Sequence, residues 1–65
     1  MNTAKVIEVI AEGNSIEDAL QNAVADASKS VRGIKSIYAD SFQAKVEDGK
    51  IKHYRVNAKI TFVLD

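Results

Sequence analysis

The stretch that decides the fold is VEDGKIKHYRVNAKITFVL, residues 46–64. Its Asp48-Gly49 pair lies between the apolar residues Val46 and Ile51. Such a pair is a strong hairpin signal, because both central residues of a type I′ turn need positive φ. After the turn, apolar and polar residues alternate with a near-regular period of two, which indicates a strand over residues 51–64. The sequence therefore predicts a β-hairpin with a long second strand.

Two further strands complete the predicted sheet. Residues 4–11 are rich in β-branched side chains and predict a strand with apolar residues on both faces. Residues 34–46 predict the first strand of the hairpin.

A helix is predicted between these strands, from Ile16 to about Arg32, because apolar residues recur there at three- and four-residue steps. Ser15 is the expected N-cap and Gly33 the expected C′ residue. The element order predicts an α+β fold (β-α-β-β), with one helix packed on a three-stranded antiparallel sheet. We expect one domain, residues 1–65.

Centring the hairpin on Asp48-Gly49 fixes a register and two faces of the sheet. The predicted pairs are Val46–Ile51, Phe42–Arg55, Tyr38–Lys59, Ile37–Ile60 and Ser36–Thr61. The face expected under the helix carries Ile37, Ala39, Val56, Ala58, Ile60, Phe62 and Leu64. The opposite face mixes apolar and polar residues: Ile34, Ser36, Tyr38, Phe42, His53, Arg55, Asn57, Lys59, Thr61 and Val63.

The small size of the chain predicts self-association. A domain of 65 residues buries only about 60% of its unfolded surface and is marginally stable alone. The usual supplements are disulfides, a metal or oligomerisation. The chain has no cysteine and one histidine, so we expect a homo-oligomer.

Composition argues against several classes of protein. The nine basic and nine acidic residues give no net charge, which argues against a nucleic-acid binder. No apolar run approaches the ~20 residues of a membrane span, and no signal peptide is apparent. The expected compartment is the cytoplasm. The sequence shows no nucleophile paired with a base and no phosphate-binding glycine loop, so we do not expect an enzyme.

The chain as a whole resembles the dodecin family. The matching stretches are residues 5–9, 15–19, 21–24, 27–29, 48–51, 54–56 and 59–62. Their order and spacing carry the resemblance. It implies a small antiparallel sheet partly wrapped around one helix, and a hollow, cubic-symmetry shell of twelve subunits. It also implies a flavin ligand, riboflavin or FMN, which family members bind and store.

The flavin site implied by the resemblance is altered in this chain. The position of the family's flavin-stacking tryptophan is occupied by Ser36, and the chain contains no tryptophan. The glutamine that hydrogen-bonds the isoalloxazine ring is replaced by Arg55, and an arginine that holds the ligand is replaced by Gln43. The resemblance is therefore closer to members that lack the tryptophan. Because serine offers no aromatic face, we expect weak or absent flavin binding.

The candidate ligand-binding residues are Ser36, Tyr38, Gln43, His53 and Arg55. One hypothesis is a pocket at a subunit junction for an anionic or aromatic ligand, in which Arg55 forks onto a phosphate or carboxylate. The alternative is that Arg55 pairs with a carboxylate of its own or a neighbouring subunit. His53 has no second metal ligand near it in the sequence.

Two functional hypotheses remain from the sequence. The first is a non-enzymatic shell that binds or stores a small ligand at subunit junctions, with flavin binding weakened or lost. The second is a calcium-binding or purely structural shell. Calcium would need six to eight oxygen ligands, and the sequence offers Asp40, Glu47, Asp48 and Asp65 without an EF-hand spacing.

Overall fold

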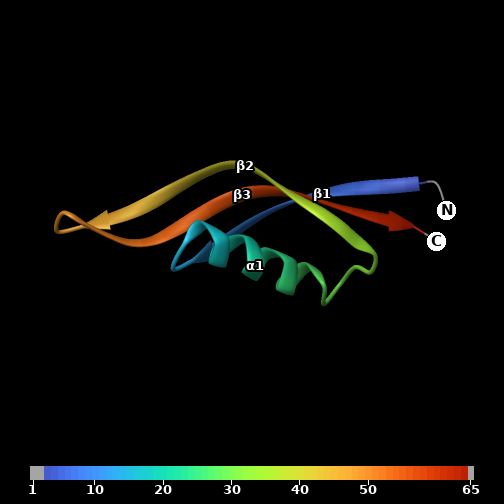
Figure 1. The fold of residues 1–65 in the computed structure, drawn as a ribbon, viewed down its shortest axis with the longest axis horizontal. Coiled ribbons are helices and arrows are strands. Elements are labelled where there is room, and N and C mark those ends of the chain that lie inside the picture. The colour runs from blue at the N-terminus through green and yellow to red at the C-terminus, as the bar shows by residue number, and fades with distance from the viewer. Residues whose placement is uncertain (1–2, 65) are drawn as a thin grey trace.

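The computed structural model describes residues 3–64 and has the predicted β-α-β-β order (Figure 1). The elements are β1 (Thr3–Gly13), α1 (Ile16–Ala27), β2 (Ile34–Glu47) and β3 (Lys50–Leu64). The strand order is β1-β3-β2, and β3 pairs antiparallel with both neighbours. The longest strand therefore lies at the centre of the sheet, and the predicted fold class is confirmed.

The hairpin turn has the backbone conformation that the Asp-Gly pair predicts. Asp48 has φ 52° and Gly49 has φ 74°, so both central residues are left-handed. This combination matches a type I′ turn, whose twist suits the flanking strands.

The start of α1 is confirmed by its cap. The hydroxyl of Ser15 accepts a hydrogen bond of 3.0 Å from the backbone N–H of Asp18. The carboxylate of Asp18 accepts in turn from the backbone N–H of Asn14, at 3.0 Å. The first bond satisfies a donor that the first helical turn leaves without an intrahelical partner, and the second ties the residue before the N-cap to that turn.

The end of α1 differs from the prediction, because the helix stops at Ala27 rather than near Arg32. The hydroxyl of Ser28 donates to the carbonyl of Val24 at 2.8 Å, and residues 28–30 form a turn. Serine side chains that bond to nearby backbone compete with helix propagation in this way. Gly33 is therefore not the C′ residue of α1. Gly33 instead lies directly before β2, and its φ is positive, at 75°.

The core lies between α1 and the middle of the sheet. Its buried residues are Ala19, Ala23 and Ala27 from α1 and Val56, Ala58, Ile60 and Phe62 from β3. Small alanine side chains let the helix approach the sheet closely. The approach is close at Gly13, where a Cβ atom would lie 2.5 Å from the backbone nitrogen of Ala19. The predicted helix-facing side of β3 is confirmed for these four residues. Leu64, predicted on the same face, remains exposed.

Three register shifts interrupt the β2–β3 pairing. The predicted pairs Val46–Ile51, Tyr38–Lys59, Ile37–Ile60 and Ser36–Thr61 are confirmed. The predicted Phe42–Arg55 pair is wrong, because Phe42 lies opposite Val56 and Gln43 lies opposite Arg55. The cause is a shift at Lys45/Val46 that a second shift at Ala39/Ser41 reverses.

Ile34 also lies on the opposite side from its predicted one. The third shift, between Ile34 and Ser36, places Ile34 opposite Phe62. Ile34 packs against the core cluster that contains Ala23, Ala27 and Ile60. The shift therefore adds one apolar side chain to the core.

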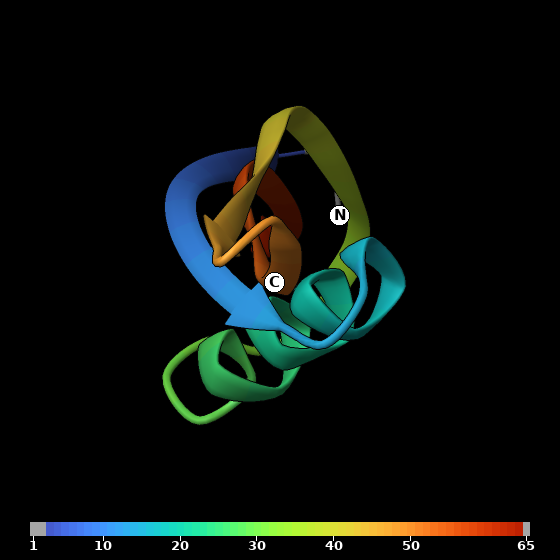
Figure 2. The same cartoon turned by 90° about the vertical axis from the view of Figure 1, so that its left-hand side faces the viewer.

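The single chain is elongated and leaves much apolar surface open. Its extents are 50 × 19 × 13 Å, and its radius of gyration is 13.4 Å, against about 11 Å for a compact domain of this length. α1 covers one face only, and the hairpin projects beyond it (Figures 1 and 2). The exposed large apolar residues are Val6, Ile10, Tyr38, Phe42, Val46, Ile51 and Leu64. Open apolar area on this scale is typical of an interaction surface.

Candidate functional site

The candidate site lies on the outer face, by which we mean the sheet face opposite α1. Three residues from three strands form one row across it: Glu12 on β1 and Gln43 on β2 both lie opposite Arg55 on β3. The next row towards the hairpin turn pairs His53 with Lys45. Two neighbouring rows therefore bring together a carboxylate from β1 and hydrogen-bond donors from β2 and β3.

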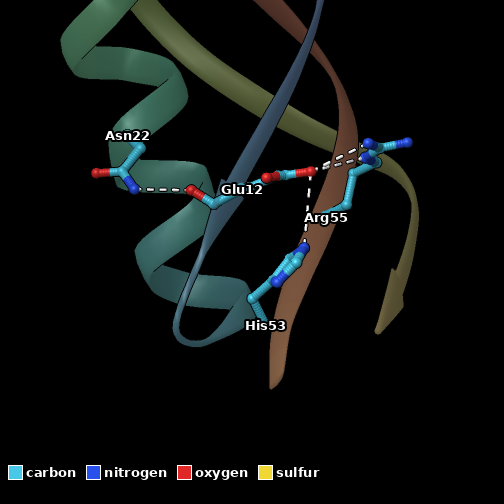
Figure 3. Close-up of polar contacts among 4 residues, drawn as sticks. All are labelled: Glu12, Asn22, His53 and Arg55. Carbon is cyan, nitrogen blue, oxygen red and sulfur yellow. Dashed lines mark hydrogen bonds and ion pairs between the residues drawn. The ribbon is translucent and has the colours of Figure 1, made fainter. Parts of the chain in front are cut away.

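Glu12 and Arg55 are joined by two hydrogen bonds (Figure 3). The Nε and Nη2 atoms of Arg55 donate to Oε2 of Glu12, at 3.2 and 3.0 Å. Both side chains are about half exposed, at 49% and 47%. The alternative that Arg55 pairs with a carboxylate of its own subunit is thus realised in the single chain.

His53 approaches the same carboxylate oxygen. Its Nε2 atom lies 3.8 Å from Oε2 of Glu12, which forms an ion pair only when the imidazole is protonated. The Oε2 atom of Glu12 thus accepts both hydrogen bonds from Arg55 and also faces His53, as Figure 3 shows.

Asn22 of α1 fixes the backbone of the same residue. Its Nδ2 atom donates to the carbonyl oxygen of Glu12 at 2.8 Å (Figure 3). The helix therefore anchors the end of β1 at the point where Glu12 projects to the outer face.

These side chains line an open cleft of about 300 Å³. Its lining residues are Glu12, Gln43, Ala44, Lys45, His53 and Arg55. Three of the five predicted ligand-binding residues, Gln43, His53 and Arg55, are therefore neighbours.

The other two predicted residues lie elsewhere on the outer face. Tyr38 is opposite Lys59 and Ser36 is opposite Thr61. At about 3.3 Å per residue, these positions are roughly 13 and 20 Å along β3 from Arg55. One subunit therefore cannot bring Ser36 and Arg55 to the same small ligand. Only a second subunit could join them.

Three lining residues of the cleft, Glu12, Ala44 and Lys45, were absent from the sequence prediction. Lys45 reaches the outer face only because the register shift places it opposite His53. Glu12 is 43 residues from Arg55 in the chain, and only the β1–β3 register brings them together. The hairpin that starts from Asp48-Gly49 carries no signal of that pairing.

Metal ligands do not cluster in the described part of the chain. Within residues 3–64, no group of three or more His, Asp or Glu side chains could hold an ion. Asp65, one of the predicted carboxylates for calcium, lies outside the described residues. In the same range, no helix is long and apolar enough to cross a membrane.

Comparison with solved structures shows the same fold in other proteins. The chain is similar to the dodecin of Streptomyces coelicolor, with 30% identity and a TM-score of 0.89 over 97% of this chain and 91% of that one. It is also similar to the tt0972 protein of Thermus thermophilus, with 23% identity and a TM-score of 0.90 over 97% and 94%. The dodecin of Streptomyces davaonensis is similar as well, with 23% identity and a TM-score of 0.88 over 97% of this chain and 94% of that one.

Comparison with protein families and with curated sequences completes the assignment. No curated protein matches the chain significantly. The family model described as Dodecin matches residues 3–65, which is nearly the whole sequence. The chain therefore belongs to the dodecin family, whose members are small, oligomeric, flavin-binding proteins.

Proposed function

We propose that this chain forms a non-enzymatic, homo-oligomeric shell of twelve subunits that binds and stores a small ligand at subunit junctions. The observation that carries this proposal is the composition of the outer face. Exposed apolar residues such as Val6, Ile10 and Tyr38 share that face with the polar cleft around Arg55. A neighbouring subunit that covers the apolar part would also enclose the cleft.

The geometry supports weak binding of riboflavin. At the position of the stacking tryptophan, Ser36 provides no ring, and stacking contributes about 0.5–1.5 kcal/mol beyond area burial. At the position of the glutamine, Arg55 only donates hydrogen bonds, whereas glutamine both donates and accepts. The Glu12 carboxylate already takes two of those donors.

The size of the assembly is tested by light scattering. Twelve chains of 7.1 kDa should give about 85 kDa. A particle that stays at 7.1 kDa at micromolar concentration would contradict the shell.

The ligand part is tested by fluorescence titration with riboflavin. We expect little quenching by the unmodified chain and a clear gain in the double variant Ser36→Trp, Arg55→Gln. The control is Ser30→Trp, which adds a tryptophan to the exposed turn after α1. Tight riboflavin binding by the unmodified chain would overturn the proposal that flavin binding is weakened. An assembled double variant that binds no flavin would favour a purely structural shell.

A further inference from the structure

His53 is the one histidine of the chain, and it lies among charged side chains on the outer face. Its Nε2 atom is 3.8 Å from Oε2 of Glu12, on β1 (Figure 3). Lys45 of β2 lies directly opposite it, and Arg55 is two residues further along β3 and lines the same cleft. Lys52, the preceding residue, lies at the register shift and does not line the cleft, and α1 is on the other face. Within residues 3–64, the charges that face His53 are therefore one carboxylate and two cations.

The carboxylate of Glu12 is already engaged by one of those cations. Its Oε2 atom accepts both hydrogen bonds from Arg55, at 3.2 and 3.0 Å. Lys45 makes no ion pair with any described residue. With a neutral imidazole, the group therefore carries one surplus positive charge. Protonation of His53 raises the surplus to two, because no second carboxylate lines the cleft.

The cost of that surplus depends on what covers the outer face. In the single chain, the side chain of His53 is 36% exposed and those of Glu12 and Arg55 are about half exposed, so water and salt screen the charges. Ile10, two residues before Glu12 on β1, is largely exposed and marks apolar surface that a neighbouring subunit would cover. Such a neighbour would displace the screening water, and like charges repel more strongly as the effective dielectric falls.

We infer that His53 is a proton-operated switch of subunit association: its protonation places a third cation beside a single carboxylate and weakens the contacts made through the outer face. This inference rests on the proposed function, since it adds regulation to the same shell. Its direction follows from linkage. The assembled form binds this proton less readily than the separate subunit, so association must weaken as the pH falls through the range in which the imidazole titrates.

The composition of the chain makes the switch testable by pH alone. Histidine and the α-amino group change charge between about pH 5 and pH 8, and the chain has no cysteine. Light scattering over a dilution series should show subunit association about ten- to hundredfold weaker at the acidic end of this range than at the basic end. The slope of the association constant against pH counts the protons taken up on dissociation.

Two variants of His53 assign the effect to its charge. His53→Gln keeps a polar side chain without a titrating group, and it should associate equally well across the range. His53→Lys carries a positive charge throughout, and it should stay dissociated at about pH 8 at concentrations at which the unmodified chain assembles. The two variants also separate His53 from the α-amino group, because that group is unchanged in both.

Variants of the surrounding charges test the mechanism. Lys45→Gln removes one of the two cations that face His53, so its association should depend less on pH. Lys59→Gln is the matched control, since it makes the same substitution on the outer face, opposite Tyr38 and away from the cleft. It should retain the full pH dependence of the unmodified chain.

A separate measurement follows the proton itself. An NMR titration of the single imidazole in the assembled protein should move to higher pH in Lys45→Gln, because a repelling cation is lost, and to lower pH in Glu12→Gln, because the carboxylate is lost. An imidazole titration that moves in neither variant would contradict the electrostatic coupling.

The outcomes separate this inference from the proposed function. A particle of about 85 kDa whose association is equally strong across the pH range, or stronger at the acidic end, would overturn the switch and leave the shell intact. A pH dependence that persists in His53→Gln would also overturn it. A particle that stays at 7.1 kDa at every pH would contradict both proposals.

Discussion

The two faces of β3 differ in what covers them within one chain. On one face, Val56, Ala58 and Ile60 are buried under the alanine stripe of α1. On the other face, Arg55, Asn57 and Lys59 alternate with them and remain exposed. The covered face is completed by local elements of the same subunit. No element formed by residues 3–64 covers the outer face, so its chemistry is available to other molecules.

The sharpest contrast between the faces is expected from Ile60→Ala. Ile60 is fully buried at the centre of the covered face, and its truncation should cost about 2–5 kcal/mol of unfolding free energy. The measurement is chemical denaturation at several protein concentrations. The matched variant is Ile10→Ala on the outer face, where Ile10 is 65% exposed in one chain.

The concentration dependence of these two variants distinguishes the faces. Ile60→Ala should destabilise at every concentration, because its contacts lie within one subunit. The effect of Ile10→Ala should vary with concentration, because its contacts would form only between subunits. Equal, concentration-independent losses would show that the faces do not differ in this way.

A smaller effect is expected from Gly13→Ala, which tests how closely α1 is held to the covered face. The added Cβ would lie 2.5 Å from the nitrogen of Ala19 and 2.9 Å from the carbonyl carbon of Asp18. Because these are backbone atoms, the start of α1 must move, at a cost of about 1–3 kcal/mol. This loss of stability is measured by thermal unfolding, monitored by circular dichroism.

Gly49→Ala serves as the comparison for that variant. No atom lies within 4 Å of its added Cβ, but its φ is 74°. Its cost of about 1–2 kcal/mol would come from backbone conformation alone. A Gly13→Ala protein as stable as the unmodified chain would show that the helix can move away without loss.

The smallest effect is expected on the outer face, from the Glu12–Arg55 pair. Both side chains are about half exposed, and such pairs contribute about 0.2–1 kcal/mol. A double-mutant cycle with Glu12→Gln and Arg55→Gln measures the coupling. A value above about 2 kcal/mol would show that a neighbouring subunit buries the pair. A value near zero would show that the charge pairing adds nothing measurable to stability in solution.

Local signals in the sequence predicted the covered face well. Asp48-Gly49 specified the turn, Ser15 specified the start of α1, and the alanine spacing identified its buried stripe. Each of these signals acts within a few residues. The end of α1 escaped prediction because the Ser28 hydroxyl bonds back to Val24, and that competition is not visible in apolar periodicity.

The outer face was less predictable because its residues meet through long-range pairing. His53 was identified from the hairpin register, and Arg55 from that register together with the family resemblance. Predicting the role of Glu12 would have required the β1–β3 register, because Glu12 and Arg55 are 43 residues apart in the chain. Gln43 entered the site through the resemblance, but its position beside Arg55 depends on two register shifts.

Those two shifts have a consequence for the chemistry available to Arg55. Asp40 and Lys52 are the residues without a direct partner at the shifts, one on each strand. In an uninterrupted ladder, the aromatic ring of Phe42 would lie directly across from the guanidinium, at a position where the two could stack. With the shifts, an amide lies there, and the ring moves to the other side of the sheet, opposite Val56. Two unpaired residues, neither of which lines the cleft, therefore decide whether Arg55 faces a hydrocarbon surface or a hydrogen-bonding partner. A single insertion or deletion in the hairpin would therefore exchange one kind of surface beside Arg55 for the other.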